Sequence, residues 1–278
     1  MNDLRYADPK FRFVYFFVVL ISLLIFSSCE KVVYIDLNTS DPRPVIEANI
    51  TNQAGPYTVR LHHSVNYYDP NTFPAITDAV VTISDNTGIS EILQQTSDGI
   101  YQTNTLQGIP GRTYTLKIMY NGKEYDAVST MPDPVAIDSV QIVQNKPEGG
   151  GNNHPGFHVT TYFTDPFILG NYYRLHLISN DTNAVDKKRY RYLSDKLTDG
   201  MEMSLSYNTN LLYNDSLTVT LESIDKSTYD FFTTLRDVVG GESSFLSAPP
   251  ANPVNNISKG GLGYFASYSV IEKSYIVR

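Results

Sequence analysis

From residue 44 to residue 131 the chain repeats short segments in which hydrophobic and polar residues alternate. A period of two is typical of a strand that buries one face, so each segment predicts a β-strand. Asn121-Gly122 is favoured as a two-residue hairpin turn because both of its positions need positive φ. Short strands joined by short turns predict an antiparallel β-sandwich over residues 44–131. Strands are expected at 44–51, 57–65, 79–84, 89–95, 99–101, 113–120 and 123–131.

The segment Met131-Pro132-Asp133-Pro134 ends this pattern. Because closely spaced prolines cannot continue a hydrogen-bonded ladder, it predicts a domain boundary, followed by a second β-rich domain over residues 135–278. One helix is predicted near residues 225–239, where Asp225 can cap the N-terminus and Gly240-Gly241 follows an apolar stripe. The strands of this domain are expected at 138–144, 157–164, 171–179, 216–222 and 262–271.

The first 29 residues have a different pattern, in which a basic start leads into about 14 mostly apolar residues and then Ser27-Ser28-Cys29. A membrane-spanning helix needs about 20 apolar residues, so residues 1–28 are predicted to be a secretory signal peptide. Small residues directly before a cysteine are typical of lipoprotein signals, although Phe26 departs from the usual pattern. We expect Cys29 to be lipidated and residues 29–43 to form a tether. The alternative is an ordinary signal peptide that precedes an unmodified cysteine.

The net charge and the cysteine content limit the classes of binding partner that the sequence favours. The chain has 21 basic and 29 acidic residues, a net charge of −8. An acidic chain without a basic cluster argues against nucleic acid or an anionic membrane surface as a ligand, so membrane attachment would come from the lipid on Cys29. Two or three acyl chains on one residue anchor a protein stably. Cys29 is the only cysteine, so no disulfide is expected.

The histidines do not predict a metal site. His62 and His63 are adjacent in an expected strand, so they point to opposite faces, and His63 falls on the apolar face and is expected in the core. His154 and His158 have a spacing that would converge on a helix, but Pro155-Gly156 lies between them and makes a helix unfavourable.

The sequence shows no catalytic constellation, so a non-enzymatic protein without a cofactor is predicted. It has no Gly-x-Ser-x-Gly elbow and no phosphate-binding loop followed by a helix. His176 shares one face of an expected strand with Tyr172 and Arg174, and His176 is interpreted as an exposed polar position.

Two loops are candidates for recognition. The loop 66–74 carries Tyr67, Tyr68 and Phe73, and aromatic residues on a loop of a rigid sandwich are a common way to build a binding surface. Loop 248–257 is the other candidate. The alternative for both is that they pack against the end of the sandwich or against the second domain.

The segments 27–31, 44–51, 55–59, 79–85, 108–116 and 256–265 together carry a family resemblance. In these segments the chain resembles a Bacteroidetes outer-membrane lipoprotein family whose domain has no known function. The region 79–101 also resembles the transthyretin-like, Ig-like sandwiches that are appended to carboxypeptidases and to outer-membrane receptors.

The resemblance implies a location and a role. Members of this family are typically encoded beside TonB-dependent receptors, which implies an outer-membrane lipoprotein that assists such a receptor in nutrient capture or uptake. Glu30 is followed by Lys31 rather than by further acidic residues, so the sequence leaves open which face of the membrane the protein occupies. The alternatives are an envelope structural or adhesion lipoprotein and a hydrolase with a dispersed active site.

Overall fold

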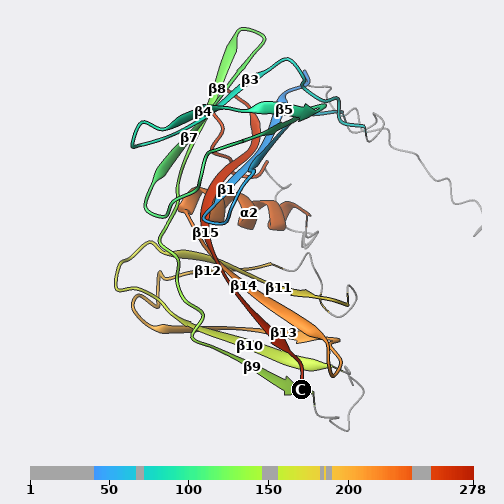
Figure 1. The fold of residues 1–278 in the computed structure, drawn as a ribbon, viewed down its shortest axis with the longest axis vertical. Coiled ribbons are helices and arrows are strands. Elements are labelled where there is room, and N and C mark those ends of the chain that lie inside the picture. Colours follow the sequence, from blue (N-terminus) through green and yellow to red (C-terminus); the bar gives the residue numbers. More distant parts are fainter. Residues whose placement is uncertain (1–40, 67–71, 146–155, 182–184, 186–189, 240–251) are drawn as a thin grey trace, which may run out of the picture. The chain divides into compact units, whose positions relative to one another are not determined.

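The structure is a computed structural model that describes residues 41–66, 72–145, 156–181, 185, 190–239 and 252–278 (Figure 1). Strand accounts for 51% of the described residues and helix for 7%, with several sheets, which confirms the predicted mainly β class. All described residues belong to one compact unit, 41–278.

The strands of the first half are short and follow one another closely. They are β1 Pro44–Thr51, β2 Thr58–His63, β3 Val80–Asp85, β4 Ser90–Ile92, β5 Gln94–Ser97, β6 Ile100–Gln102, β7 Thr113–Tyr120 and β8 Lys123–Thr130. The elements of the second half are β9 Ser139–Gln144, β10 Phe157–Thr164, β11 Tyr172–Ser179, β12 Arg191–Ser194, β13 Glu202–Thr209, β14 Ser216–Ile224, α2 Lys226–Val239 and β15 Leu262–Ile276.

These strands form three sheets. An eight-stranded sheet has the order β12-β11-β14-β15-β1-β2-β6-β5, and it is accompanied by a four-stranded sheet, β4-β3-β7-β8, and a three-stranded sheet, β13-β10-β9. One apolar core contains residues of both the eight-stranded and the four-stranded sheet, and a second contains residues of the eight-stranded and the three-stranded sheet. Two sandwiches therefore share the eight-stranded sheet.

The last strand, β15, joins the two sandwiches within that sheet. Its first part, from Leu262 to Tyr268, pairs in parallel with β1, and its second part, from Ser269 to Ile276, pairs antiparallel with β14. Phe265 of β15 is fully buried in the core of the first sandwich. Residues 44–131 therefore do not complete that core by themselves, and whether the predicted domains fold independently stays a prediction.

Several local expectations differ from the structure. The segment 89–95 was expected to be one strand, but it divides into β4 and β5, which belong to different sheets, because Leu93 between them turns into the core. Strands β12 and β13 were not expected at all. The parallel pairing of β1 and β15 departs from the predicted antiparallel arrangement, and β15 continues five residues beyond the expected end at Ile271.

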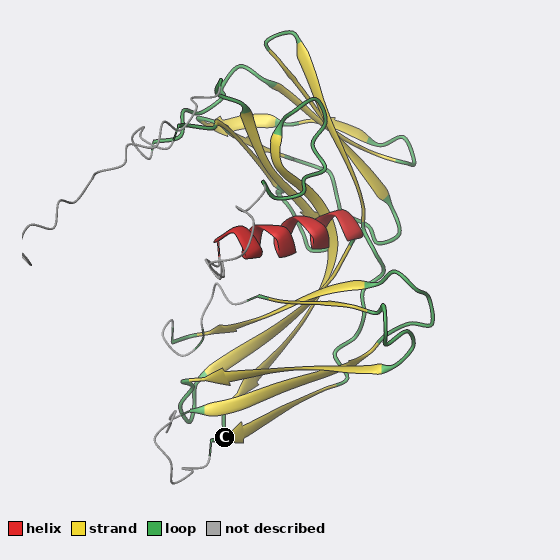
Figure 2. Ribbon diagram, turned by 180° about the vertical axis from the view of Figure 1, so that it is seen from behind, coloured by secondary structure: helices red, strands yellow, loops and turns green. Residues whose placement is uncertain are grey.

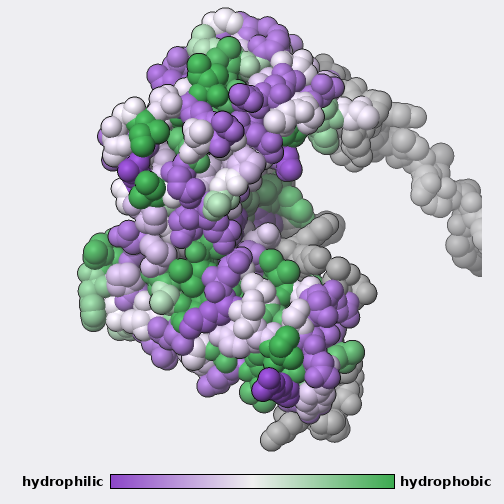
Figure 3. All heavy atoms as spheres, in the orientation of Figure 1, coloured by the Kyte–Doolittle hydropathy of each residue, from purple (hydrophilic) through white to green (hydrophobic). Residues whose placement is uncertain are grey.

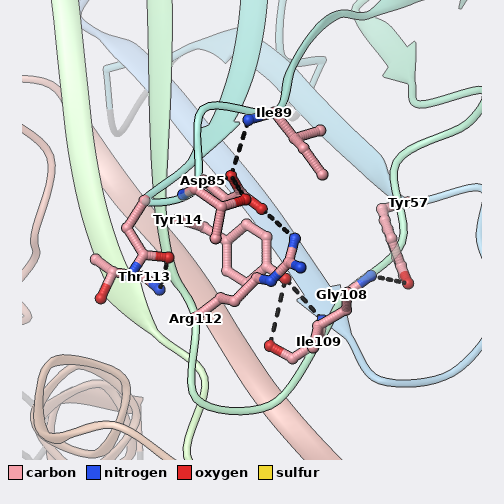
Figure 4. A network of polar contacts seen from close by, with 10 residues as sticks. Tyr57, Asp85, Ile89, Gly108, Ile109, Arg112, Thr113 and Tyr114 are labelled. Atoms are coloured by element: carbon pink, nitrogen blue, oxygen red, sulfur yellow. Dashed lines mark hydrogen bonds and ion pairs between the residues drawn. The ribbon is translucent and has the colours of Figure 1, made fainter.

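A buried carboxylate fixes the turn between β3 and β4 (Figure 4). Asp85 Oδ1 accepts hydrogen bonds from the amides of Thr87 and Ile89 at 2.9 and 3.0 Å, and Oδ2 pairs with Arg112 Nη1 at 2.5 Å. Burial raises the pKa of Asp85, but these hydrogen bonds outweigh it and hold the pKa below the usual value. The charged Asp85 thus stabilises the tight turn between β3 and β4, which pair with each other in the four-stranded sheet.

Candidate functional site

A buried ion pair lies on one face of the eight-stranded sheet. Arg174 on β11 is the cross-strand partner of Glu222 on β14, and because cross-strand partners point to the same face, the two side chains meet. Arg174 Nε donates a hydrogen bond to Glu222 Oε2, and the side chains are only 9% and 6% exposed. This face of the sheet is therefore covered, and Glu222 neutralises the charge of Arg174 there.

Aromatic rings from three parts of the chain surround the guanidinium group. Arg174 Cζ lies 4.8 Å from the ring centroid of Phe232, 5.0 Å from that of Tyr268 and 5.1 Å from that of Tyr190. Phe232 comes from α2 and Tyr268 from β15, while Tyr190 directly precedes β12. Such cation–π contacts strengthen when water is excluded, which compensates part of the cost of burying the charge.

Burial and neighbouring charges shift the pKa of Arg174 and of three tyrosines near it. Burial alone lowers the pKa of Arg174, but the charge and hydrogen bond of Glu222 raise it above the ordinary value. Burial raises the pKa of Tyr264 to about 12, and it also raises the pKa of Tyr192 and Tyr268. The tyrosine hydroxyls therefore act as neutral hydrogen-bond donors and acceptors.

The rings and Arg174 line a pocket of about 550 Å³, which we call the tyrosine pocket. Asn49 donates a hydrogen bond from Nδ2 to the Tyr268 hydroxyl at 2.9 Å, so a side chain of β1 also contributes. Arg236 and Val239 of α2 are exposed lining residues. The lining consists of Asn49, Arg174, Tyr190, Tyr192, Phe232, Leu235, Arg236, Val239, Tyr264 and Tyr268.

Helix α2 contacts β11 and β15 (Figure 2). Four of its residues line the tyrosine pocket: Phe232, Leu235, Arg236 and Val239. Phe232 stacks on Tyr192 with ring centroids 6.2 Å apart and packs edge-on against Tyr264 at 4.9 Å. The predicted N-cap is confirmed, because Asp225 Oδ1 accepts a hydrogen bond from the Thr228 amide at 2.8 Å. Asp225 Oδ2 also accepts one from the Ser129 hydroxyl at 2.7 Å, which fastens the start of the helix to β8.

His176 lies two residues beyond Arg174 on the same face of β11. Its ring centroid is 4.9 Å from that of Tyr190, and its Nδ1 atom is buried without a hydrogen-bond partner among the described residues. Burial lowers the pKa of His176. The expectation that His176 is exposed is wrong, because aromatic side chains cover this face of the sheet and leave the residue half-buried.

The family comparison gives one result for nearly the whole chain. The family described as "Domain of unknown function (DUF4249)" matches residues 30–274. The chain belongs to the DUF4249 family. A search of curated proteins finds no match. A solved structure titled "Cytokine receptor complex - Crystal form 1A" is 11% identical over 83% of this chain and 94% of that chain. Its TM-score is 0.24, which is too low to indicate a shared fold.

The residues predicted to bind or to carry lipid lie elsewhere in this DUF4249 chain. Cys29, Tyr67 and Tyr68 fall outside the described residues, as do residues 248–251 of the candidate loop 248–257. Phe73 is 55% exposed and packs edge-on against His62 with ring centroids 5.4 Å apart. It does not line the tyrosine pocket, and its role in binding stays a prediction.

The structure describes two of the other histidines that the sequence analysis considered, His63 and His158. His63 is half-buried rather than a full core residue, and its Nε2 lies 3.0 Å from the Tyr120 hydroxyl. His158 Nδ1 lies 2.8 Å from Asn208 Oδ1, and His154 falls outside the described residues. No helix in the described part of the chain is long and apolar enough to cross a membrane.

A cluster of three aspartates was not found from the sequence. Carboxylate oxygens of Asp165, Asp195 and Asp199 lie within 4.8 Å of one another. Asp165 Oδ2 accepts a hydrogen bond from the Gly200 amide at 3.0 Å, while Asp195 Oδ2 accepts one from the Gly170 amide at 2.7 Å. These bonds brace two loops, 165–171 and 195–201, against each other. The three carboxylates by themselves do not define a metal site.

Proposed function

We propose that this DUF4249 protein is a non-catalytic binding protein, anchored in the outer membrane by lipid on Cys29, that captures a nutrient for a TonB-dependent receptor. The tyrosine pocket is the observation that carries the binding role. A pocket with several aromatic rings and a few fixed polar groups has the composition of a small-molecule site. Its volume of about 550 Å³ is within the range of such sites.

The groups that line the pocket favour binding over catalysis. They offer tyrosine hydroxyls, the Asn49 amide and two guanidinium groups, and none of the lining residues is a carboxylate, an imidazole or a thiol that would act as a general base. The nearest carboxylate, Glu222, is engaged by Arg174. Hydrolase activity therefore has no support from this site.

The same groups indicate the chemistry of the ligand. Rings such as Tyr190 and Tyr192 offer flat apolar faces, while their hydroxyls and the Asn49 amide offer hydrogen bonds at the edges. Because Glu222 already neutralises Arg174, the buried part of the pocket does not demand a charged ligand. We propose a compact ring-shaped ligand with an apolar face and polar substituents.

The location and the receptor partner are supported by the sequence. The leader that ends in Ser27-Ser28-Cys29 supports lipidation, and the family resemblance supports association with a TonB-dependent receptor. Lipid on Cys29 would hold the domain that carries the tyrosine pocket close to a membrane receptor, and this protein would need no membrane-spanning helix for that.

Co-purification tests this role. An affinity tag is placed after Arg278, the native outer membrane is extracted in mild detergent, and the eluted proteins are identified by mass spectrometry. The proposal predicts that a TonB-dependent receptor elutes in near-stoichiometric amount with the lipidated protein. Recovery of the protein alone would contradict the receptor role and would favour an envelope structural or adhesion protein.

A further inference from the structure

Two loops of the second sandwich present an unusual group of exposed apolar side chains. Loop 165–171 joins β10 to β11, and loop 195–201 joins β12 to β13. Figure 3 shows hydrophobic residues gathered at the left edge, over these loops. We call this group the apolar loop tip. Its members and their exposed fractions are Phe167 85%, Ile168 70%, Leu169 69%, Leu197 87% and Met201 57%.

The aspartate cluster holds the apolar loop tip in place. Asp195 Oδ2 accepts hydrogen bonds from the amides of Gly170 and Asn171 at 2.7 and 2.9 Å, so a residue of the second loop fixes the end of the first. In the other direction, Asp165 accepts from the Gly200 amide, and the Asp165 amide donates to the Met201 carbonyl at 3.0 Å. The apolar side chains are thus displayed on a braced support.

Gly200 adds a packing constraint to this brace. Its φ of +68° is in the left-handed region, and a Cβ atom at this position would lie 2.2 Å from the Phe167 ring. The glycine therefore allows the two loops to approach closely enough for Phe167 to sit against the backbone of its neighbour. This arrangement keeps the apolar side chains of both loops together.

We propose that the apolar loop tip inserts into the lipid bilayer that holds the Cys29 anchor. A contiguous exposed apolar patch marks an interaction site for a membrane or a protein. The tip consists of side chains that project from two loop ends, and a fluid bilayer accepts such a shape without a complementary groove. Lys196, which is exposed beside Leu197, would remain among the headgroups, where its charge favours anionic lipids.

The length of chain between the anchor and the described unit favours the bilayer over other occupants. The unit begins at Asp41, so 11 residues lie between Cys29 and the unit, and 12 Cα–Cα steps join Cys29 to Asp41. A fully extended segment of this length spans at most about 42 Å. The tether therefore holds the unit within about one protein diameter of the lipid surface, where even weak insertion is strengthened by the high effective concentration.

The inference rests on the lipid anchor of the proposed function, and one reconstitution tests both separately. Cys29 is the only cysteine, so Leu197→Cys in the lipidated protein gives a single free thiol for an environment-sensitive fluorophore. Ile92→Cys is the matched control, because Ile92 is 67% exposed on β4, away from the two loops. Both proteins are reconstituted in vesicles of phosphatidylethanolamine and phosphatidylglycerol, with and without brominated acyl chains.

The expected result is a blue shift and quenching by brominated lipid for the label at position 197, with neither change at position 92. Equal behaviour at the two positions in vesicles that contain firmly anchored protein would overturn the insertion and leave the anchor intact. Failure of the protein to float with the vesicles, together with an unmodified Cys29 in the mass spectrum, would overturn the anchor and the inference with it. A label at position 197 that is shielded only in native membranes and cross-links to a protein there would also overturn the bilayer as occupant.

Discussion

Arg174 and Glu222 face each other across β11 and β14 and form an ion pair that is almost completely buried. They do not belong to the apolar core of either sandwich, and their side chains lie beneath the aromatic rings of the tyrosine pocket. The pair fixes a positive group under the rings and keeps that group from becoming an uncompensated buried charge.

Removal of one member of this pair should be much more damaging than removal of both. Glu222→Leu leaves the Arg174 charge buried and unpaired, and we expect a loss of about 3–5 kcal/mol in the free energy of unfolding. The double variant Arg174→Met/Glu222→Leu should recover most of that loss. Urea unfolding of the two single variants and the double variant measures this. If the three variants lose equal stability, the pair is not coupled as described.

Asp225 should matter both for stability and for binding, because it caps α2 and fastens it to β8. Asp225→Ala should lower the free energy of unfolding by about 1 kcal/mol or more, since one cap and two bonds to β8 are lost. Lys226→Ala, which removes an exposed ion pair at the next position, should have little effect. Ligand affinity of the tyrosine pocket should fall only in Asp225→Ala, because Phe232 of α2 loses its position.

His176 should make the stability depend on pH near neutrality. Burial lowers its pKa, so the unfolded chain binds a proton that the folded chain resists. The contribution of neutral His176 is therefore fully present above pH 6.5 and is lost as the pH falls below 6.5 toward the folded-state pKa.

The test compares His176→Gln with His158→Gln, which alters a histidine that is hydrogen-bonded to Asn208 on another sheet. Urea unfolding between pH 7.5 and pH 5 should show a weaker dependence on pH in His176→Gln than in the parent protein. His158→Gln is the control for the loss of one imidazole outside the tyrosine pocket. An unchanged dependence in His176→Gln would show that the imidazole is not held neutral.

The aspartates of the brace should have unequal effects. Asp195→Ala leaves the amides of Gly170 and Asn171 without their acceptor, and we expect a loss of about 1–3 kcal/mol and faster hydrogen exchange of those two amides. Asp199 Oδ1 is buried without a hydrogen-bond partner in the described part of the chain, beside two other carboxylates. Asp199→Ala should therefore leave stability unchanged or raise it, because a like charge is removed.

Addition of calcium distinguishes a brace from a metal site. The brace predicts that millimolar calcium does not raise the melting temperature of the parent protein or of either variant. A calcium-dependent rise that disappears in Asp199→Ala would contradict it and would make the three carboxylates a cation site.

The sequence predicted the parts of the fold that depend on local pattern. The alternation along β2 and β7, the Asn121-Gly122 turn and the Asp225 cap each follow from residues close together in the chain. The pairing of β15 with both β1 and β14 joins segments more than 200 residues apart for β1, and no local pattern specifies it. The parallel register could not be deduced for the same reason.

The tyrosine pocket was missed because its residues come from five separate helices and strands and from the segment that precedes β12. Arg174 alternates with Tyr172 and His176, and that pattern is the one expected of an exposed polar face. Glu222 gave no signal either, because it follows Thr218 and Thr220 on the polar face of the alternating strand 216–222. The abundance of tyrosine was noticeable, but composition does not show which rings meet.

The central claim is that the tyrosine pocket binds a ligand, and a melting-temperature screen tests it most directly. The mature protein, Tyr190→Ala and Tyr213→Ala are compared with a panel of sugars, nucleosides, aromatic acids and short peptides. Tyr213 is a matched control because it is 56% exposed and does not line the pocket. The account predicts a compound that raises the melting temperature of the parent protein and of Tyr213→Ala but not that of Tyr190→Ala. A rise that is retained in full by Tyr190→Ala would contradict it.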